Sequence, residues 1–164
     1  MIPVYQTKTV HIDGSGNCFN ACIASLLELR LRDLPQILPS DPGDWHERWA
    51  AHLADFGVDI VYHGAHTVPQ GWAMASVMTN RTFPEDHPKA GKHIAHSVIV
   101  FNGKVIHDPF PGGSEITSIN HYSTLVPLTE TEKKIHTLKA QEGFCYHGYK
   151  SECDHPDCKN DSIG

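Results

Sequence analysis

The sequence is organised around one stretch, Gly16-Asn17-Cys18-Phe19-Asn20-Ala21-Cys22-Ile23-Ala24-Ser25-Leu26-Leu27. Its apolar residues recur at helical spacing, and no proline interrupts them (Phe19, Cys22, Ile23, Leu26 and Leu27). We therefore expect a helix from Cys18 to about Leu29. A turn-forming run of Gly, Ser, Asp and Asn at 13–17 comes before it. Cys18 is thus expected where a flexible, glycine-containing turn enters an apolar helix.

This position suits a reactive thiol. Only the thiolate is a good nucleophile, and its ordinary pKa of about 8.5 falls next to a helix N-terminus or an imidazolium. The free N–H groups of the first helical turn supply positive potential and can donate to a developing oxyanion. Composition alone favours a buried structural cysteine at position 18, which is also what we expect of Cys22.

Two further strands are predicted at 95–101 and 104–108, joined at Asn102-Gly103, a pair typical of hairpin turns. A two-residue turn would place His96 and Asp108 on opposite faces, because side chains alternate along a strand. A three-residue loop of residues 101–103 that ends at a left-handed glycine would instead place His96 directly opposite Asp108. We expect this bulged loop, in which Asp108 would hold the His96 imidazole and stabilise its charged form.

The remaining pattern indicates an α+β fold in which helices come first and an antiparallel sheet follows. We expect a second helix from Trp45 to Phe56, ended by Gly57, with one buried apolar stripe (Trp45, Trp49, Leu53 and Phe56). Further strands are expected at 58–62, 71–78 and 122–128, a short helical turn at 33–38, a long loop at 79–93 and a capped helix from 129 to about 141.

Together, the stretches 16–27, 96–100 and 105–109 resemble small papain-like proteins encoded in phage and prophage genomes, and the similarity spans roughly residues 1–128. A weaker resemblance links the Cys18 motif to ovarian-tumour-type deubiquitinases, although Asp13-Gly14 is displaced here by two inserted residues. The first resemblance implies a papain-like fold with N-terminal helices packed on an antiparallel sheet. It also implies Cys18 as the nucleophile, His96 as its base and Asp108 as the residue that orients His96.

The oxyanion donor departs from that pattern. Many papain-like enzymes carry a glutamine about six residues before the cysteine, and this position is Ile12 here. Gln6 is one candidate donor, separated from Cys18 by a flexible loop, and Asn17 is another.

Composition limits the other classes of function. The chain has 164 residues, five cysteines and a net charge of −6, without a cluster of Lys and Arg. This argues against a nucleic-acid partner, and no apolar run approaches the ~20 residues of a membrane span. An odd cysteine count without a secretion signal favours reduced thiols and a cytoplasmic location, in the host cell if a phage encodes the protein.

We expect a catalytic domain at 1–142 that requires no cofactor, and a Cys/His-rich tail at 143–164. Five possible zinc ligands lie in that tail (Cys145, His147, Cys153, His155 and Cys158). Zinc usually takes four such ligands and could order a short appendage. The alternative is a tail whose cysteines are incidental. His63 and His66 flank Gly64 and are expected to be ordinary loop histidines.

These observations predict a thiol hydrolase or acyltransferase that acts on an amide, isopeptide or ester bond of a peptide or protein substrate. The alternative is a catalytically idle binding module on the same scaffold, such as a phage inhibitor of a host protein.

Overall fold

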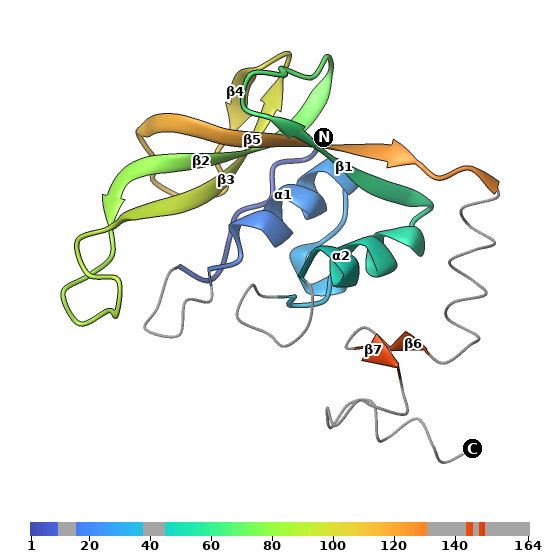
Figure 1. Cartoon of the computed structure of the whole chain (residues 1–164), viewed down its shortest axis with the longest axis horizontal. Helices are drawn as coiled ribbons and strands as arrows, with labels where there is room; N and C mark the ends of the chain where they lie inside the picture. Colours follow the sequence, from blue (N-terminus) through green and yellow to red (C-terminus); the bar gives the residue numbers. More distant parts are fainter. Residues whose placement is uncertain (10–15, 38–44, 131–143, 146–147, 150–164) are drawn as a thin grey trace. The chain divides into compact units, whose positions relative to one another are not determined.

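The computed structural model describes residues 1–9, 16–37, 45–130, 144–145 and 148–149. Its elements are α1 (Cys18–Leu27), the 3-10 turn η1 (Leu31–Asp33), α2 (Trp45–Ala54), β1 (Val58–Gly64), β2 (Trp72–Thr82), β3 (His93–Phe101), β4 (Lys104–His107), β5 (Ile116–Pro127), β6 (Phe144–Cys145) and β7 (Gly148–Tyr149). Strands β1 to β5 form an antiparallel sheet in the order β1-β5-β2-β3-β4, and β6 pairs with β7 (Figure 1). The α+β class predicted from the sequence is confirmed.

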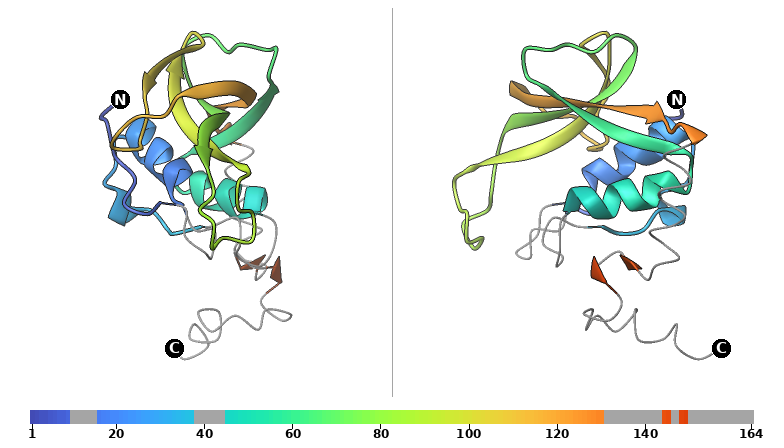
Figure 2. Two further views of the ribbon diagram at one scale, coloured as in Figure 1. Left: turned by 90° about the vertical axis from the view of Figure 1, so that its left-hand side faces the viewer. Right: turned by 45° about the vertical axis from the view of Figure 1, so that its right-hand side comes forward.

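The chain divides into two compact units. The first comprises residues 1–40 and 61–124, and the second comprises residues 41–60 and 125–164. Within the first unit, α1 packs against β3 (Figures 1 and 2). The expected separation of a tail at residue 143 stays a prediction.

Helix α1 begins at Cys18, as expected, and ends at Leu27. It ends there because Glu28 adopts a left-handed conformation with φ 57°, while the N–H at this cap donates to the Ala24 carbonyl. The middle of the helix, residues 20–25, is buried. The Glu28 carboxylate binds the N-terminal ammonium at 2.7 Å, which brings the start of the chain to the end of α1.

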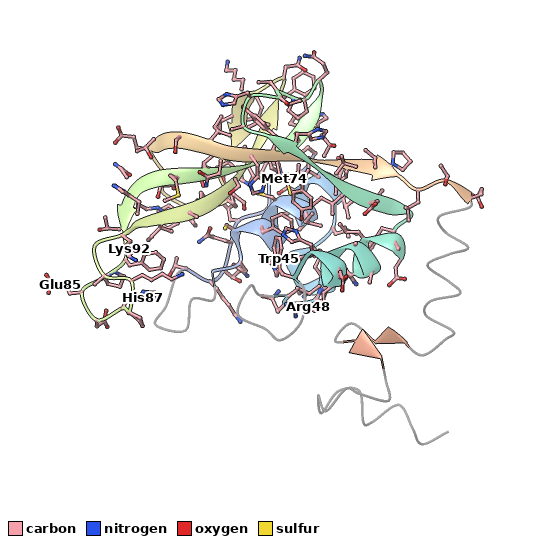
Figure 3. The ribbon with its side chains drawn as sticks, viewed as in Figure 1. Trp45, Arg48, Met74, Glu85, His87 and Lys92 are labelled. Atoms are coloured by element: carbon pink, nitrogen blue, oxygen red, sulfur yellow. The ribbon has the colours of Figure 1, made fainter. Side chains whose placement is uncertain are left out.

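The β2–β3 hairpin forms the centre of the sheet, with Val77 paired with His96. Its buried core combines small and β-branched residues (Ala73, Ala75, Val77, Val98, Val100 and Tyr122). The expectation of a loop over 79–93 is wrong at both ends, because β2 continues to Thr82 and β3 begins at His93. Cross-strand hydrogen bonding overrides the polar composition there. Glu85 and His87 lie in the loop that joins these strands (Figure 3).

The β3–β4 turn differs from the prediction. Phe101 pairs with Lys104, so Asn102 and Gly103 alone form the turn, with φ of 49° and 77°. Positive φ at both residues is the two-residue geometry that Asn-Gly favours, and the predicted three-residue loop is therefore wrong. A Cβ on Gly103 would lie 2.6 Å from Val68 Cγ1, so a side chain at this position would also require Val68 to shift.

A β-bulge nevertheless restores the face that Asp108 needs. Val100 pairs with Val105, but Ile99 pairs with His107, which leaves Ile106 as the extra residue. Without the bulge, Asp108 would lie across from Ser97, on the face opposite His96. Continuing the shifted register by one residue places Asp108 across from Val98, which shares the face of His96.

Several other predictions need correction. The short helical turn lies at Leu31–Asp33 rather than at 33–38. Helix α2 ends at Ala54, and Phe56, expected on its buried stripe, is 41% exposed. Trp49 and Leu53 do form its buried face. Most of the helix expected at 129–141 lies outside the described residues.

Strands β1 and β5 are longer than predicted. In the part of the chain that the structure describes, no helix is both long and apolar enough to cross a membrane.

Candidate active site

Cys18 is the first residue of α1 and is partly accessible, whereas Cys22, one turn later, is fully buried. Both are free thiols. The His96 ring hydrogen-bonds to Cys18, and the N–H and hydroxyl of Ser97 donate to the same sulfur. The sequence prediction that Cys18 and His96 meet is thus matched by their contact in the structure.

His96 also contacts Asp108. Its Nε2 donates to Asp108 Oδ1 at 2.6 Å, and the two side chains are only 2% and 15% exposed. The Phe110 N–H donates to the same Oδ1 at 2.8 Å and fixes the carboxylate. Because Nε2 is occupied by Asp108, Nδ1 is the ring nitrogen that faces Cys18. The three residues therefore form a linear series of hydrogen bonds from thiol to imidazole to carboxylate.

The electrostatics favour a thiolate–imidazolium pair. Burial by itself raises the pKa of the Cys18 thiol, but the hydrogen bond and charge of His96, together with Ser97, lower that pKa overall. Burial likewise lowers the pKa of His96, yet the contacts with Asp108 and Cys18 raise it to about 9. Burial raises the pKa of Asp108, and the His96 and Phe110 contacts outweigh this and lower it. Each member of the series stabilises the charged form of its neighbour.

Ser97 is a site residue to which the sequence analysis assigned no role. It follows His96 directly, and its two donors stabilise negative charge on sulfur. Ser114 is a second such residue, because its hydroxyl helps to lower the pKa of Asp108. Neither position has a sequence signal of its own, since serine is common in strands and turns. Proximity to His96 is the only feature that could have singled out Ser97.

Asn17, one of the two candidate oxyanion donors, has another role. Its side chain is fully buried, and Oδ1 accepts from the backbone N–H groups of Thr7 at 3.1 Å and Lys8 at 2.9 Å. Its Nδ2 donates to Thr7 Oγ1 and Gln36 Oε1. Both Nδ2 protons are therefore used, and the side-chain amide holds the N-terminal segment against the start of α1.

Gln6, the other candidate, is held next to the site from two sides. Its backbone N–H donates to the Pro109 carbonyl at 2.9 Å, and the following residues are tied to Asn17. Pro109 and Asn17 are the chain neighbours of Asp108 and Cys18. The buried Gln6 side chain uses Nε2 to donate to the Lys8 carbonyl at 3.1 Å, which leaves a second amide proton for another acceptor.

His107, which the sequence analysis left without a role, also anchors this segment. Its Nε2 donates to the Val4 carbonyl at 2.9 Å, and its ring contacts Tyr5 edge to face. Residues 4–6 are therefore fixed to the end of β4 and the residues that follow it.

We expect Asn17→Ala to release residues 6–8 from α1. The variant loses four side-chain hydrogen bonds, so its free energy of unfolding should fall by about 2 kcal/mol, and amide hydrogen exchange at Thr7 and Lys8 should accelerate. Asn20→Ala is the matched control, because Asn20 is equally buried but donates to Pro35 instead. Equal exchange at Thr7 and Lys8 in the two variants would contradict this role.

No group of three or more metal-ligating side chains occurs among the residues that the structure describes. This does not test the proposed zinc ligands, because His147, Cys153, His155 and Cys158 lie outside the described residues and only the backbone of Cys145 is placed. His63 Nε2 bonds to Thr124 Oγ1 at 2.9 Å, as a structural strand residue does.

Comparison with protein-family models, curated proteins and solved structures finds no match to this chain. The functional argument therefore rests on the geometry of the site.

Proposed function

We propose that the protein is a cysteine-dependent hydrolase or acyltransferase that acts on an amide, isopeptide or ester bond of a peptide or protein. The observation that carries this proposal is the hydrogen-bonded series Cys18–His96–Asp108, in which the thiol pKa is lowered and the imidazole pKa is raised to about 9. A binding module has no need to charge a thiol in this way. The papain-like arrangement, with a helix that starts at the nucleophile packed on the strand of its base, is part of the same proposal, as are the cytoplasmic location and phage origin.

In the first half-reaction, the Cys18 thiolate attacks the substrate carbonyl carbon, and a C–S bond forms as the carbonyl π electrons move to oxygen. The oxyanion then collapses and expels the leaving group. The His96 imidazolium gives its Nδ1 proton to the leaving amine or alkoxide. The products of this step are a thioester on Cys18, a free amine or alcohol, and neutral His96, which stays hydrogen-bonded to Asp108.

In the second half-reaction, water attacks the thioester in a hydrolase, whereas a second amine or alcohol attacks it in an acyltransferase. The attacking molecule gives a proton to His96 Nδ1, the C–S bond breaks, and the thiolate–imidazolium pair is restored. Gln6 Nε2 and the N–H of Cys18 at the first position of α1 are the donors that we assign to the oxyanion. The hydrogen bonds that fix residues 6–8 support this assignment for Gln6.

We expect p-nitrophenyl acetate to acetylate Cys18. Intact-mass spectrometry of an acid-quenched mixture should show one added acetyl group, and nitrophenolate should appear in a burst. Cys18→Ala should give neither signal. Cys22→Ala is the matched control. Burial raises the pKa of the Cys22 thiol well above its usual range, so Cys22 should not be the reacting thiol and its loss should leave acetylation of Cys18 intact.

Labelling with iodoacetamide at about pH 6 separates the proposal from the idle binding module. An activated Cys18 should react much faster than free cysteine. Slow labelling, together with no Cys18-dependent acetylation, would favour the idle module. A lysate acyl donor trapped on Cys18 and identified by mass spectrometry would then name the scissile bond.

A further inference from the structure

Arg81, near the end of β2, is a cation without an anionic partner in the part of the chain that the structure describes. Its guanidinium carbon lies 3.9 Å from the centre of the Phe110 ring, and its Nε is buried without a hydrogen-bond partner. Among the described residues, no carboxylate forms an ion pair with it. The carboxylate of Glu115 is bound instead by Asn80 Nδ2 at 2.7 Å. In a chain with a net charge of −6, an unpaired and partly buried guanidinium is unusual.

Arg81 lies near the start of β3, the strand that carries His96. Met78 pairs with Ala95 and Thr82 pairs with His93, so the irregular stretch of β2 that contains Arg81 lies opposite residues 93–95 of β3, just before His96. His93 is three positions from His96, or about 10 Å along the strand. The Phe110 ring on which Arg81 stacks belongs to the residue whose N–H fixes the Asp108 carboxylate. Strand register and ring contact therefore place the guanidinium independently beside the same end of the site.

We propose that Arg81 binds a carboxylate of the substrate and makes the site selective for acyl donors or acceptors that carry one near the reacting carbonyl. This inference rests on the proposed function and names the substrate class for it. The planar guanidinium can give paired hydrogen bonds to a carboxylate, and stacking on Phe110 holds it in place for them. The carboxylate could belong to an acidic side chain or to the C-terminus of a peptide.

Stacking alone does not account for this residue. An arginine that only covered Phe110 could keep its polar nitrogens in water, as exposed arginines do. Here Nε is buried without an acceptor, which is costly unless something pairs with it. A carboxylate bound by the Nη groups, which are not buried, would offset the cost of this partly desolvated cation.

The test uses bromoacetyl amino acids, in which Cys18 displaces bromide from the CH2 carbon and the molecule ends in a carboxylate on methylene spacers of increasing length. The matching carboxamides are neutral. For each spacer, the ratio of the two second-order rate constants is the readout, so general changes in thiolate reactivity cancel. The His96 imidazolium contributes to this ratio in every variant that retains it.

In the wild type, the acid-to-amide ratio should peak at one spacer length. Arg81→Gln should lower that peak about tenfold. Arg81→Lys should retain part of the peak, because lysine keeps the positive charge but cannot form the paired hydrogen bonds of a guanidinium. Lys104→Gln is the control, because it removes the same charge at a more distant position. Lys104 pairs with Phe101, five positions along β3 from His96, so this variant should keep the peak. A ratio unchanged in Arg81→Gln at every length would overturn the inference.

The outcomes keep this inference separate from the proposed function. Slow iodoacetamide labelling of the wild type would contradict the proposed function. Rapid labelling together with an acid-to-amide ratio that does not depend on Arg81 would contradict only the role of Arg81. Bromoacetyl dipeptides then distinguish the source of the carboxylate. One set carries it on an aspartate side chain with an amidated terminus, and the other carries it at the free terminus. The set whose rates depend more on Arg81 identifies the source, and independence of Arg81 in both sets overturns the inference.

Discussion

In His96→Ala, the pKa of the Cys18 thiol should rise above the value of about 8.5 for a free cysteine. Burial already raises this pKa, and the hydrogen bond and charge of His96 are the main contributions that oppose it. Without them, burial favours the uncharged, protonated thiol. The thiolate fraction at about pH 6 should therefore fall.

The difference in ultraviolet thiolate absorbance between each protein and its Cys18→Ala counterpart, titrated with pH, isolates this pKa from the titration of the other four cysteines. His107→Ala is the matched control, because His107 is also buried but bonds to the Val4 carbonyl. It should leave the Cys18 titration close to that of the wild type. A Cys18 titration that did not move in His96→Ala would show that the two residues are not paired.

The second large effect is expected in Asp108→Asn. The hydrogen bond to the Asp108 carboxylate is the largest of the contributions that raise the pKa of His96 to about 9. Burial lowers the same pKa, so the pKa of His96 should fall when the carboxylate is removed. His96 must be protonated to give a proton to an amine leaving group. In the wild type this condition holds up to about pH 9, so kcat/KM for an amide substrate should decline above that pH.

In Asp108→Asn, the decline should begin at a lower pH, and the maximal rate should fall by about a hundredfold or more. The pH profile of kcat/KM and NMR titration of the His96 ring measure the two effects separately. Asp86→Asn, which alters an exposed carboxylate in the 83–92 loop, is the control. An alkaline limb that stayed at about pH 9 in Asp108→Asn would exclude the carboxylate from this role.

Local patterns were sufficient to predict α1 and its start. The apolar spacing of residues 19–27 predicts a helix, and the turn-forming composition of residues 13–17 predicts where it begins. The β3–β4 hairpin could be predicted for the same reason, because Asn-Gly adopts positive φ at both positions at little cost. The choice of Cys18, His96 and Asp108 followed from these two elements together with the resemblance of the motifs.

The sequence predicts a loop that starts at residue 79, whereas β2 extends to Thr82, because local composition does not include the pairing of β2 with β3. Residues 79–82 have turn-like composition, but the Thr79 hydroxyl is buried and donates to the Ile94 carbonyl at 2.9 Å across the hairpin. That partner is available only after β2 and β3 pair. Strand formation here depends on the sheet rather than on local preference.

The sequence pattern predicted the helix that begins at Cys18, a hairpin at Asn102-Gly103 and the residue types that a thiol-based site requires, but it predicted the wrong length for the turn. Only the tertiary structure decided that Asp108 faces His96. The turn alone would put them on opposite faces, and the bulge at Ile106 reverses this. Contacts with residues about a hundred positions earlier accompany that bulge, since His107 binds Val4 and Pro109 binds Gln6. Local backbone preferences carry no information about contacts at such separation, so the bulge cannot be predicted from the hairpin sequence alone.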